Sequence, residues 1–99
     1  MSVRYTPRAR RHLDGIAAFI SAHNEEAARR VGVRIRETIE LLAEFPRMGH
    51  KGTVSHTLEM VVPGLPFIVV YRVDSNGGQE NLIVLGIYHC AQLRPAKSQ

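Results

Sequence analysis

Three side chains in the second half of the chain have the chemistry to act on a phosphate ester. Arg72 interrupts an otherwise apolar run and could stabilise the negative charge that develops on the oxygens around phosphorus. His89 could donate or accept a proton, because imidazole gains and loses its proton near neutral pH. Glu59, in the preceding apolar run, could act as a base. These groups are a cation, an acid and a base, which can act together on a phosphate ester.

Each of these residues also has a structural explanation. A single histidine at a strand end is more often a hydrogen-bonded packing residue than a catalyst. Arg72 could make an ion pair with Glu59, since an arginine in so apolar a strand needs a partner. Tyr88 has a suitable hydroxyl, but it precedes His89, so strand alternation would place the two side chains on opposite faces. After His89 the chain has neither a tyrosine nor another histidine to complete such a site.

The strand that carries Arg72 is the expected centre of a sheet. Between Pro66 and Arg72 every residue is β-branched or aromatic, which predicts a strand covered on both faces. Apolar runs at 57–62 and 82–88 lie on either side of it in the sequence, and the turn-forming residues 74–78 precede the second run. The pattern predicts an antiparallel meander of three strands with residues 65–73 in the middle.

The sequence of the N-terminal half predicts a short edge strand at residues 3–6, followed by two amphipathic helices. Thr6 and Pro7 are typical of a helix start, Asn24 ends the first helix and caps the second, and Pro46 ends the second. Helices joined by so short a link should fold back as an antiparallel hairpin and bury their apolar stripes against the sheet. The apolar positions are Leu13, Ile16, Ala17 and Ile20 in the first helix, and Ala28, Val31, Ile35, Ile39, Leu42 and Phe45 in the second.

Length and cysteine content limit the protein class. The chain has 99 residues, which suits a single domain over 1–99 with a modest core. Its one cysteine, Cys90, cannot form an internal disulfide, so we expect the protein to reside in a reducing cytoplasm.

The first twenty residues are charged and lack an unbroken apolar run, so we expect no signal peptide and no membrane span. The spacing of His50, His56, His89 and Cys90 matches no ligand pattern, and we expect neither a metal nor a cofactor.

Basic residues outnumber acidic ones by 13 to 9, and the formal net charge is +4. All the basic residues except Lys51 and Lys97 are arginine, whose planar, permanently charged fork suits carboxylates and phosphates. This bias favours an acidic or nucleic-acid partner. Some of the charges could instead form ion pairs on solvated helix faces, as the spacing of Glu26 and Arg30 suggests.

Residues 46–56, which we call the basic loop, have no apolar periodicity. They contain two glycines and the basic side chains Arg47, His50, Lys51 and His56. We expect a mobile, irregular connection between the second helix and the sheet.

Three motifs together carry a family resemblance. Residues 45–49, Phe-Pro-Arg-Met-Gly, contain a Pro-x-x-Gly signature at the end of the second helix. Residues 66–73 read Pro-Phe-Ile-Val-Val-Tyr-Arg-Val, and residues 84–89 read Val-Leu-Gly-Ile-Tyr-His. With the helix spacing, these motifs resemble the ParE/RelE family of bacterial toxins over nearly the whole chain. The resemblance implies an α+β fold: an N-terminal edge strand, then an antiparallel helix hairpin packed on an antiparallel β-meander.

The resemblance also implies a partner. Toxins of type II toxin–antitoxin, or plasmid stabilisation, modules inhibit growth and are neutralised in a hetero-oligomer by a cognate antitoxin encoded beside them. Such antitoxins typically wrap the toxin with a segment that orders on binding, and acidic side chains on it could meet arginines on the two helices. The candidate antitoxin-binding residues are Arg8, Arg11, Arg29, Arg30, Arg34 and Arg36.

The family divides by target. Its RelE-like branch cleaves messenger RNA on the ribosome, whereas its ParE-like branch inhibits DNA gyrase without a catalytic constellation. Where the nuclease branch commonly has an arginine on the strand before the central one, this chain has Leu58. We therefore expect a ParE-like gyrase inhibitor, with a RelE-like ribosome-dependent endoribonuclease as the alternative. The candidate target-binding residues are Arg47, His50, Lys51, Arg72 and His89, of which Arg72 and His89, with Glu59, would be catalytic in a nuclease.

A third hypothesis is a nucleic-acid-binding module without toxicity. It ranks last, because the basic stretches of this chain lack the interleaved aromatic residues on which bases stack.

Overall fold

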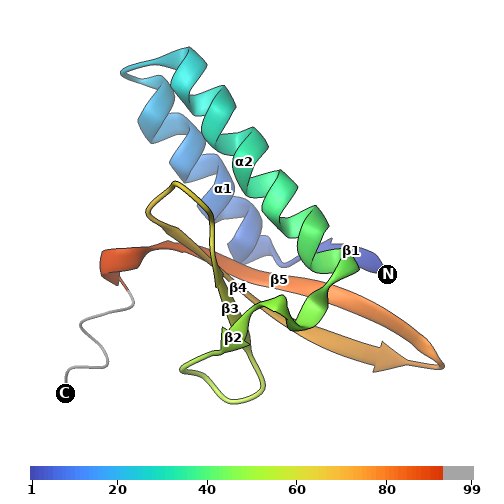
Figure 1. Cartoon of the computed structure of the whole chain (residues 1–99). Coiled ribbons are helices and arrows are strands. Elements are labelled where there is room, and N and C mark those ends of the chain that lie inside the picture. Colours follow the sequence, from blue (N-terminus) through green and yellow to red (C-terminus); the bar gives the residue numbers. More distant parts are fainter. Residues whose placement is uncertain (93–99) are drawn as a thin grey trace.

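Two helices lie side by side over one face of a five-stranded sheet (Figure 1). The computed structural model describes residues 1–92. In chain order the elements are β1 (Ser2–Tyr5), α1 (Pro7–Ser21), α2 (Glu25–Glu44), the 3₁₀ turn η1 (Pro46–Met48), β2 (His50–Lys51), β3 (Leu58–Val61), β4 (Phe67–Asn76) and β5 (Gln79–His89).

The strand order in the sheet is β1-β5-β4-β3-β2. The predicted meander of β3, β4 and β5 is confirmed, with every pair antiparallel and β4 in the middle. The predicted edge strand β1 is also confirmed, but it pairs with β5 in parallel, so the sheet is mixed. At the other edge β2 pairs with β3 inside the basic loop, where we expected no regular structure. A two-residue strand is too short to leave a periodic pattern in a sequence.

The hairpin between β4 and β5 is longer than predicted. Residues 74–76 were expected in the turn, but they continue β4 and pair with β5 up to Asn76 and Gln79. Only Gly77 and Gly78 form the turn, with φ angles of 60° and 84°. A two-residue turn with positive φ at both positions matches the right-handed twist of the flanking strands, and glycine adopts it without strain.

Both helices begin where the sequence predicts. The Thr6 hydroxyl accepts a hydrogen bond from the Ala9 N–H at 3.1 Å, and the Asn24 side chain accepts one from the Ala27 N–H at 3.0 Å. These caps satisfy N–H groups that have no partner within their own helix. No helix in residues 1–92 is both long enough and apolar enough to cross a membrane.

The core lies between the helix layer and the sheet. At the centre of β4 the consecutive residues Val69, Val70 and Tyr71 are 0%, 8% and 0% exposed, so this strand is covered on both faces, as predicted. The fully buried side chains include Ile35, Ile39 and Leu42 of α2, Val69 and Tyr71 of β4, and Leu82 and Val84 of β5.

Tyr71 joins the core to the segment that follows α2. Its buried hydroxyl donates a hydrogen bond to the Pro46 carbonyl at 2.7 Å and accepts one from the Gly49 N–H at 3.1 Å. Gly49 has no room for a side chain, because a Cβ there would collide with this hydroxyl. Tyr71 therefore fixes the start of the basic loop against the sheet.

The Tyr71→Phe change should lower the free energy of unfolding by about 1–3 kcal/mol, because it leaves two backbone groups without their partner. Urea denaturation measures the effect. Tyr88→Phe is the matched control: its hydroxyl has no hydrogen bond to the described residues, and the change should stay within about 0.5 kcal/mol. Equal stability of Tyr71→Phe and the parent chain would contradict the assigned role.

His12 closes an edge of β5 that β1 leaves uncovered. β1 pairs with β5 only as far as Val84. Beyond it, the Ile87 N–H donates to Nδ1 of His12 at 3.1 Å, and the ring of Tyr88 lies edge-on to the imidazole at 4.8 Å. Because Nδ1 accepts this hydrogen bond, it carries no proton in the folded protein. Burial, followed by the charges of Arg8 and Arg11, lowers the pKa of His12 below its ordinary value of 6.5.

His12 should therefore make stability depend on pH. Since its pKa is lower in the folded chain, the unfolded chain binds more protons as the pH falls below about 6.5, and the folded chain loses stability. His12→Ala should cost about 1–2 kcal/mol at pH 7.5, and the difference from the parent chain should narrow towards pH 5. Urea titrations at several pH values test this, and a constant difference across the range would contradict it.

Candidate functional site

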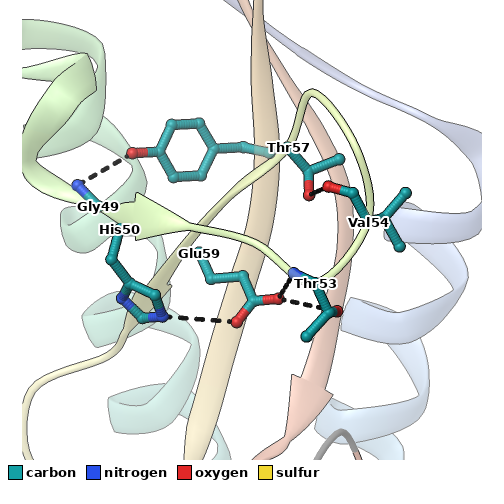
Figure 2. A network of polar contacts seen from close by, with 7 residues as sticks. Gly49, His50, Thr53, Val54, Thr57 and Glu59 are labelled. Atoms are coloured by element: carbon teal, nitrogen blue, oxygen red, sulfur yellow. Dashed lines mark hydrogen bonds and ion pairs between the residues drawn. The ribbon is translucent and has the colours of Figure 1, made fainter. Parts of the chain in front are cut away.

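Glu59 holds the basic loop in shape (Figure 2). It lies on β3 opposite His50 of β2, and only 8% of its side chain is exposed. One carboxylate oxygen accepts a hydrogen bond from the Thr53 N–H at 3.1 Å and lies 3.4 Å from the Thr53 hydroxyl. The other oxygen lies 3.6 Å from Nε2 of His50. This carboxylate joins two parts of the loop.

The second half of the loop folds on its own hydrogen bonds. The Gly52 N–H donates to the Thr57 carbonyl at 2.9 Å, and the Thr57 hydroxyl donates to the Val54 carbonyl at 2.6 Å. A side chain at Gly52 would collide with that hydroxyl. His56 has a φ of 65°, a left-handed conformation that is uncommon outside glycine. The irregular connection expected here is therefore a folded turn.

This turn presents Val54 at the surface with basic side chains beside it. Val54 is 64% exposed although it is apolar. It lines an open hollow of about 790 Å³ together with Arg47, Lys51 and His56, and no aspartate or glutamate is among the described residues around it. His50 is directed at Glu59, yet 67% of its side chain is exposed. An exposed apolar tip within a basic surface suits a protein or phosphate-bearing partner.

Arg72 pairs with Asp74. The sequence had suggested Glu59 as its partner. Nε and Nη2 of Arg72 donate to the two carboxylate oxygens of Asp74 at 2.8 and 3.1 Å. These hydrogen bonds raise the pKa of Arg72 and lower that of Asp74. Because the two residues are two positions apart in β4, their side chains lie on the same face, and the pair forms within a single strand. The guanidinium charge of Arg72 is thereby balanced.

His89 lies far from Arg72. In β5 it pairs with Phe67, which is five residues before Arg72 along β4, or roughly 16 Å at strand spacing. The odd separation places the two side chains on opposite faces of the sheet. The imidazole lies edge-on to the Phe67 ring at 5.7 Å, and its Nδ1 accepts the Ala91 N–H at 3.1 Å. Arg72, His89 and Glu59 therefore do not converge on one reacting atom.

The six candidate arginines occupy separate surfaces. Arg34 donates to the Pro63 carbonyl at 2.9 Å and lies 4.0 Å from Glu37. The others fall into three groups: Arg29 and Arg30 lie with Arg34 beside a shallow hollow on α2, Arg36 lies in a groove between α1 and α2, and Arg8 and Arg11 lie near Tyr88 at the start of α1.

Sequence reasoning missed several residues that shape these surfaces. The role of Asp74 could have been predicted from the sequence, because it lies two residues after Arg72 and period-two alternation places both on one strand face. The roles of Thr53 and Thr57 could not, since they depend on Glu59 and on the fold of the loop. Within residues 1–92, no three His, Cys, Asp or Glu side chains lie close enough together to hold a metal ion.

Comparisons with known proteins identify the family and support the fold. A family model described as "ParE toxin of type II toxin-antitoxin system, parDE" matches residues 3–94. The "Putative toxin Y4kP" of Sinorhizobium fredii is 36% identical over 93 residues, which are 94% of this chain and 92% of that protein. A structure described as the chromosomal ParDE system of P. aeruginosa superposes with a TM-score of 0.76 at 22% identity, covering 90% of this chain and 95% of that one. A YoeB/ParE toxin from Agrobacterium tumefaciens gives 0.64 at 18% identity, covering 90% and 98%.

Removal of the Glu59 carboxylate should loosen the basic loop. In Glu59→Ala we expect the Thr53 amide to exchange its hydrogen at least about tenfold faster, because a lost charge-assisted hydrogen bond is worth about 1.5–3 kcal/mol. Hydrogen–deuterium exchange with mass spectrometry over residues 50–58 measures this. Glu80→Ala, on the exposed end of the β4–β5 hairpin, is the control and should leave the loop unchanged. Slow exchange at Thr53 in Glu59→Ala would show that the loop does not depend on this carboxylate.

Proposed function

Because this chain belongs to the ParE family of toxins of type II toxin–antitoxin systems, we propose that it arrests bacterial growth by inhibiting DNA gyrase in the cytoplasm. A cognate antitoxin neutralises it by direct binding in a hetero-oligomer. The toxin acts by occupying a surface of its target, with no chemical step of its own.

Two features carry this proposal: His89 is separated from the other two nuclease candidates, and Glu59 and Arg72 are each engaged by another residue. RNA cleavage needs a base, an acid and a cation on one scissile phosphate, within hydrogen-bond reach of the reacting atoms. In this chain Glu59 accepts a hydrogen bond from Thr53, and the positive charge of Arg72 is balanced by the carboxylate of Asp74. His89 lies on the other face of the sheet. Leu58 occupies the position where the nuclease branch commonly has an arginine, so a second cation is absent at that position.

The basic loop is the surface that we assign to the gyrase contact. Arg47, His50 and Lys51 lie in it, beside the exposed tip formed by Val54. The network around Glu59 fixes the loop before binding, so little conformational entropy is lost when the target docks. The other two candidate target-binding residues, Arg72 and His89, lie on β4 and at the end of β5, and would contribute only to a wider interface.

We assign antitoxin binding to the helix hairpin and its surroundings. The six candidate arginines (Arg8, Arg11, Arg29, Arg30, Arg34 and Arg36) lie on several sides of the hairpin. An antitoxin that contacts all of them would extend around it, as a segment that orders on binding can.

The purified toxin should inhibit supercoiling by DNA gyrase and should not cut messenger RNA in a translation extract. Reversal of charge at Arg47 and Lys51 together should weaken supercoiling inhibition at least about tenfold, since loss of rim charges slows association and adds repulsion. Arg4→Glu, on β1 at the opposite edge of the sheet, is the matched control and should inhibit as the parent chain does.

His89→Ala should likewise leave gyrase inhibition nearly unchanged. Codon-positioned cleavage of message that is lost in both Arg72→Ala and His89→Ala would instead establish the RelE-like endoribonuclease. Unimpaired growth on expression without an antitoxin would rule out both toxic activities.

A further inference from the structure

The hollow beside the basic loop is large for so small a protein. Its volume is about 790 Å³, against about 440 Å³ for the groove between α1 and α2. We call it the basic hollow, and it is lined by residues 51–58 together with Arg47 and Val73. The loop after β2 projects from the sheet away from the two helices, so an occupant of this hollow need not touch the helix hairpin (Figure 1).

The basic side chains of this hollow are not neutralised by the described part of the chain. Arg47, Lys51 and His56 are exposed, and none of them forms an ion pair with a described residue. No aspartate or glutamate is among the described lining residues. On the neighbouring strand, by contrast, Arg72 is balanced by Asp74. An occupant that brings negative charge would balance the hollow.

Each of these basic side chains extends from a backbone that is already fixed. Arg47 is in the 3₁₀ turn that the Tyr71 hydroxyl holds against the sheet. Lys51 is in β2 and pairs with β3. His56 lies in the folded turn that follows, which internal hydrogen bonds close. The cationic groups are therefore arranged before any partner arrives, which lowers the entropy lost on binding.

The backbone of His56 favours a different residue. Its φ of 65° is the one positive value outside glycine in residues 1–92. Glycine adopts this conformation without strain, whereas a residue with a side chain is held there at a cost in stability. Residues held in such conformations are common at ligand-binding sites. The imidazole offers what glycine lacks, a ring N–H that donates a hydrogen bond in either protonation state.

The donors around the hollow are of the kinds that contact the backbone of a nucleic acid. Phosphate oxygens are bound by arginine and lysine side chains, by serine and threonine hydroxyls and by backbone N–H groups. The hollow combines Arg47 and Lys51 with Ser55, and the backbone N–H groups of Ser55 and His56 donate to no described residue. No phenylalanine, tyrosine or tryptophan is among the described lining residues, so an unpaired base would find no ring on which to stack. This set matches the phosphates of a duplex.

We propose that the basic hollow binds the phosphate backbone of the duplex DNA on which gyrase acts. Arg47 and Lys51 pair with phosphates, and the His56 ring N–H donates to a phosphate oxygen. The toxin consequently prefers the complex of gyrase with DNA to the enzyme alone. This inference rests on the proposed function, and it specifies that the basic loop contacts the DNA held by gyrase and not an acidic surface of the enzyme.

Three variants remove a donor without adding negative charge: Arg47→Gln, Lys51→Gln and His56→Gly. Glycine relieves the strained backbone at position 56, so His56→Gly should melt at or above the temperature of the parent chain. Weaker binding by this variant cannot then be attributed to loss of the fold. Arg4→Gln is the matched control, because Arg4 is an exposed arginine on β1, at the opposite edge of the sheet.

The experiment measures the binding of purified gyrase to immobilised toxin, with and without a linear DNA duplex. At about 50 mM salt the parent toxin should bind the gyrase–DNA complex at least about tenfold more tightly than gyrase alone. Most of this preference should be lost at about 200 mM salt, because two phosphate contacts weaken binding roughly tenfold over that range. Each of the three donor variants should lower the preference at least about threefold, and Arg4→Gln should keep it.

Other outcomes separate the failures. Equal binding of gyrase with and without DNA, weakened alike in the donor variants, would show that the hollow binds an acidic surface of the enzyme. It would overturn this inference and leave the proposed function standing, provided that the parent chain inhibits supercoiling. A preference for the complex that all three donor variants retain would also overturn it, because the DNA contact would then lie elsewhere on the toxin. A parent chain that does not inhibit supercoiling would overturn the proposed function, and this inference with it.

Discussion

The hydroxyl of Tyr71 is the point on which the arrangement of this protein depends. It lies in the core between the two layers and uses both of its hydrogen-bonding roles on the segment after α2, at Pro46 and Gly49. A buried hydroxyl without partners would be costly, so this segment has essentially one favourable position. The direction in which the chain leaves the helix layer, and hence the place of β2 and the basic loop, follows from that pair of bonds.

The polar residues of the sheet serve shape more than chemistry. Glu59, the most buried charged side chain in the described chain, accepts hydrogen bonds from a loop, and Arg72 is matched by a carboxylate two residues away on its own strand. Each of these ionic groups is therefore held by another part of the chain. Under the proposed function, the fold presents a binding surface while its ionic groups pair with other groups of the chain.

The sequence predicted the elements of this fold wherever the signal was local. The caps at Thr6 and Asn24 and the apolar run of β4 lie within a few residues of the structures that they specify, which is why these predictions were confirmed. Contacts between distant residues were not predictable in this way. His12 meets Ile87 75 residues away. The Arg72–Asp74 pair is local, but the sequence predicted Asp74 in a turn, and only the continuation of β4 past its apolar part puts the two residues on one strand.

The parallel pairing of β1 with β5 has a consequence for biosynthesis. The strand β1 joins the strand β5, which is made much later, and the hydrogen bond from Thr6 to Leu85 spans 79 residues. Contacts of such long range form late, because the whole intervening chain must be available before the loop between them can close. A nascent chain therefore has its helices before β1 can pair with β5 and complete the sheet. The surfaces that depend on the completed sheet consequently form in one late step, after β5 has been synthesised.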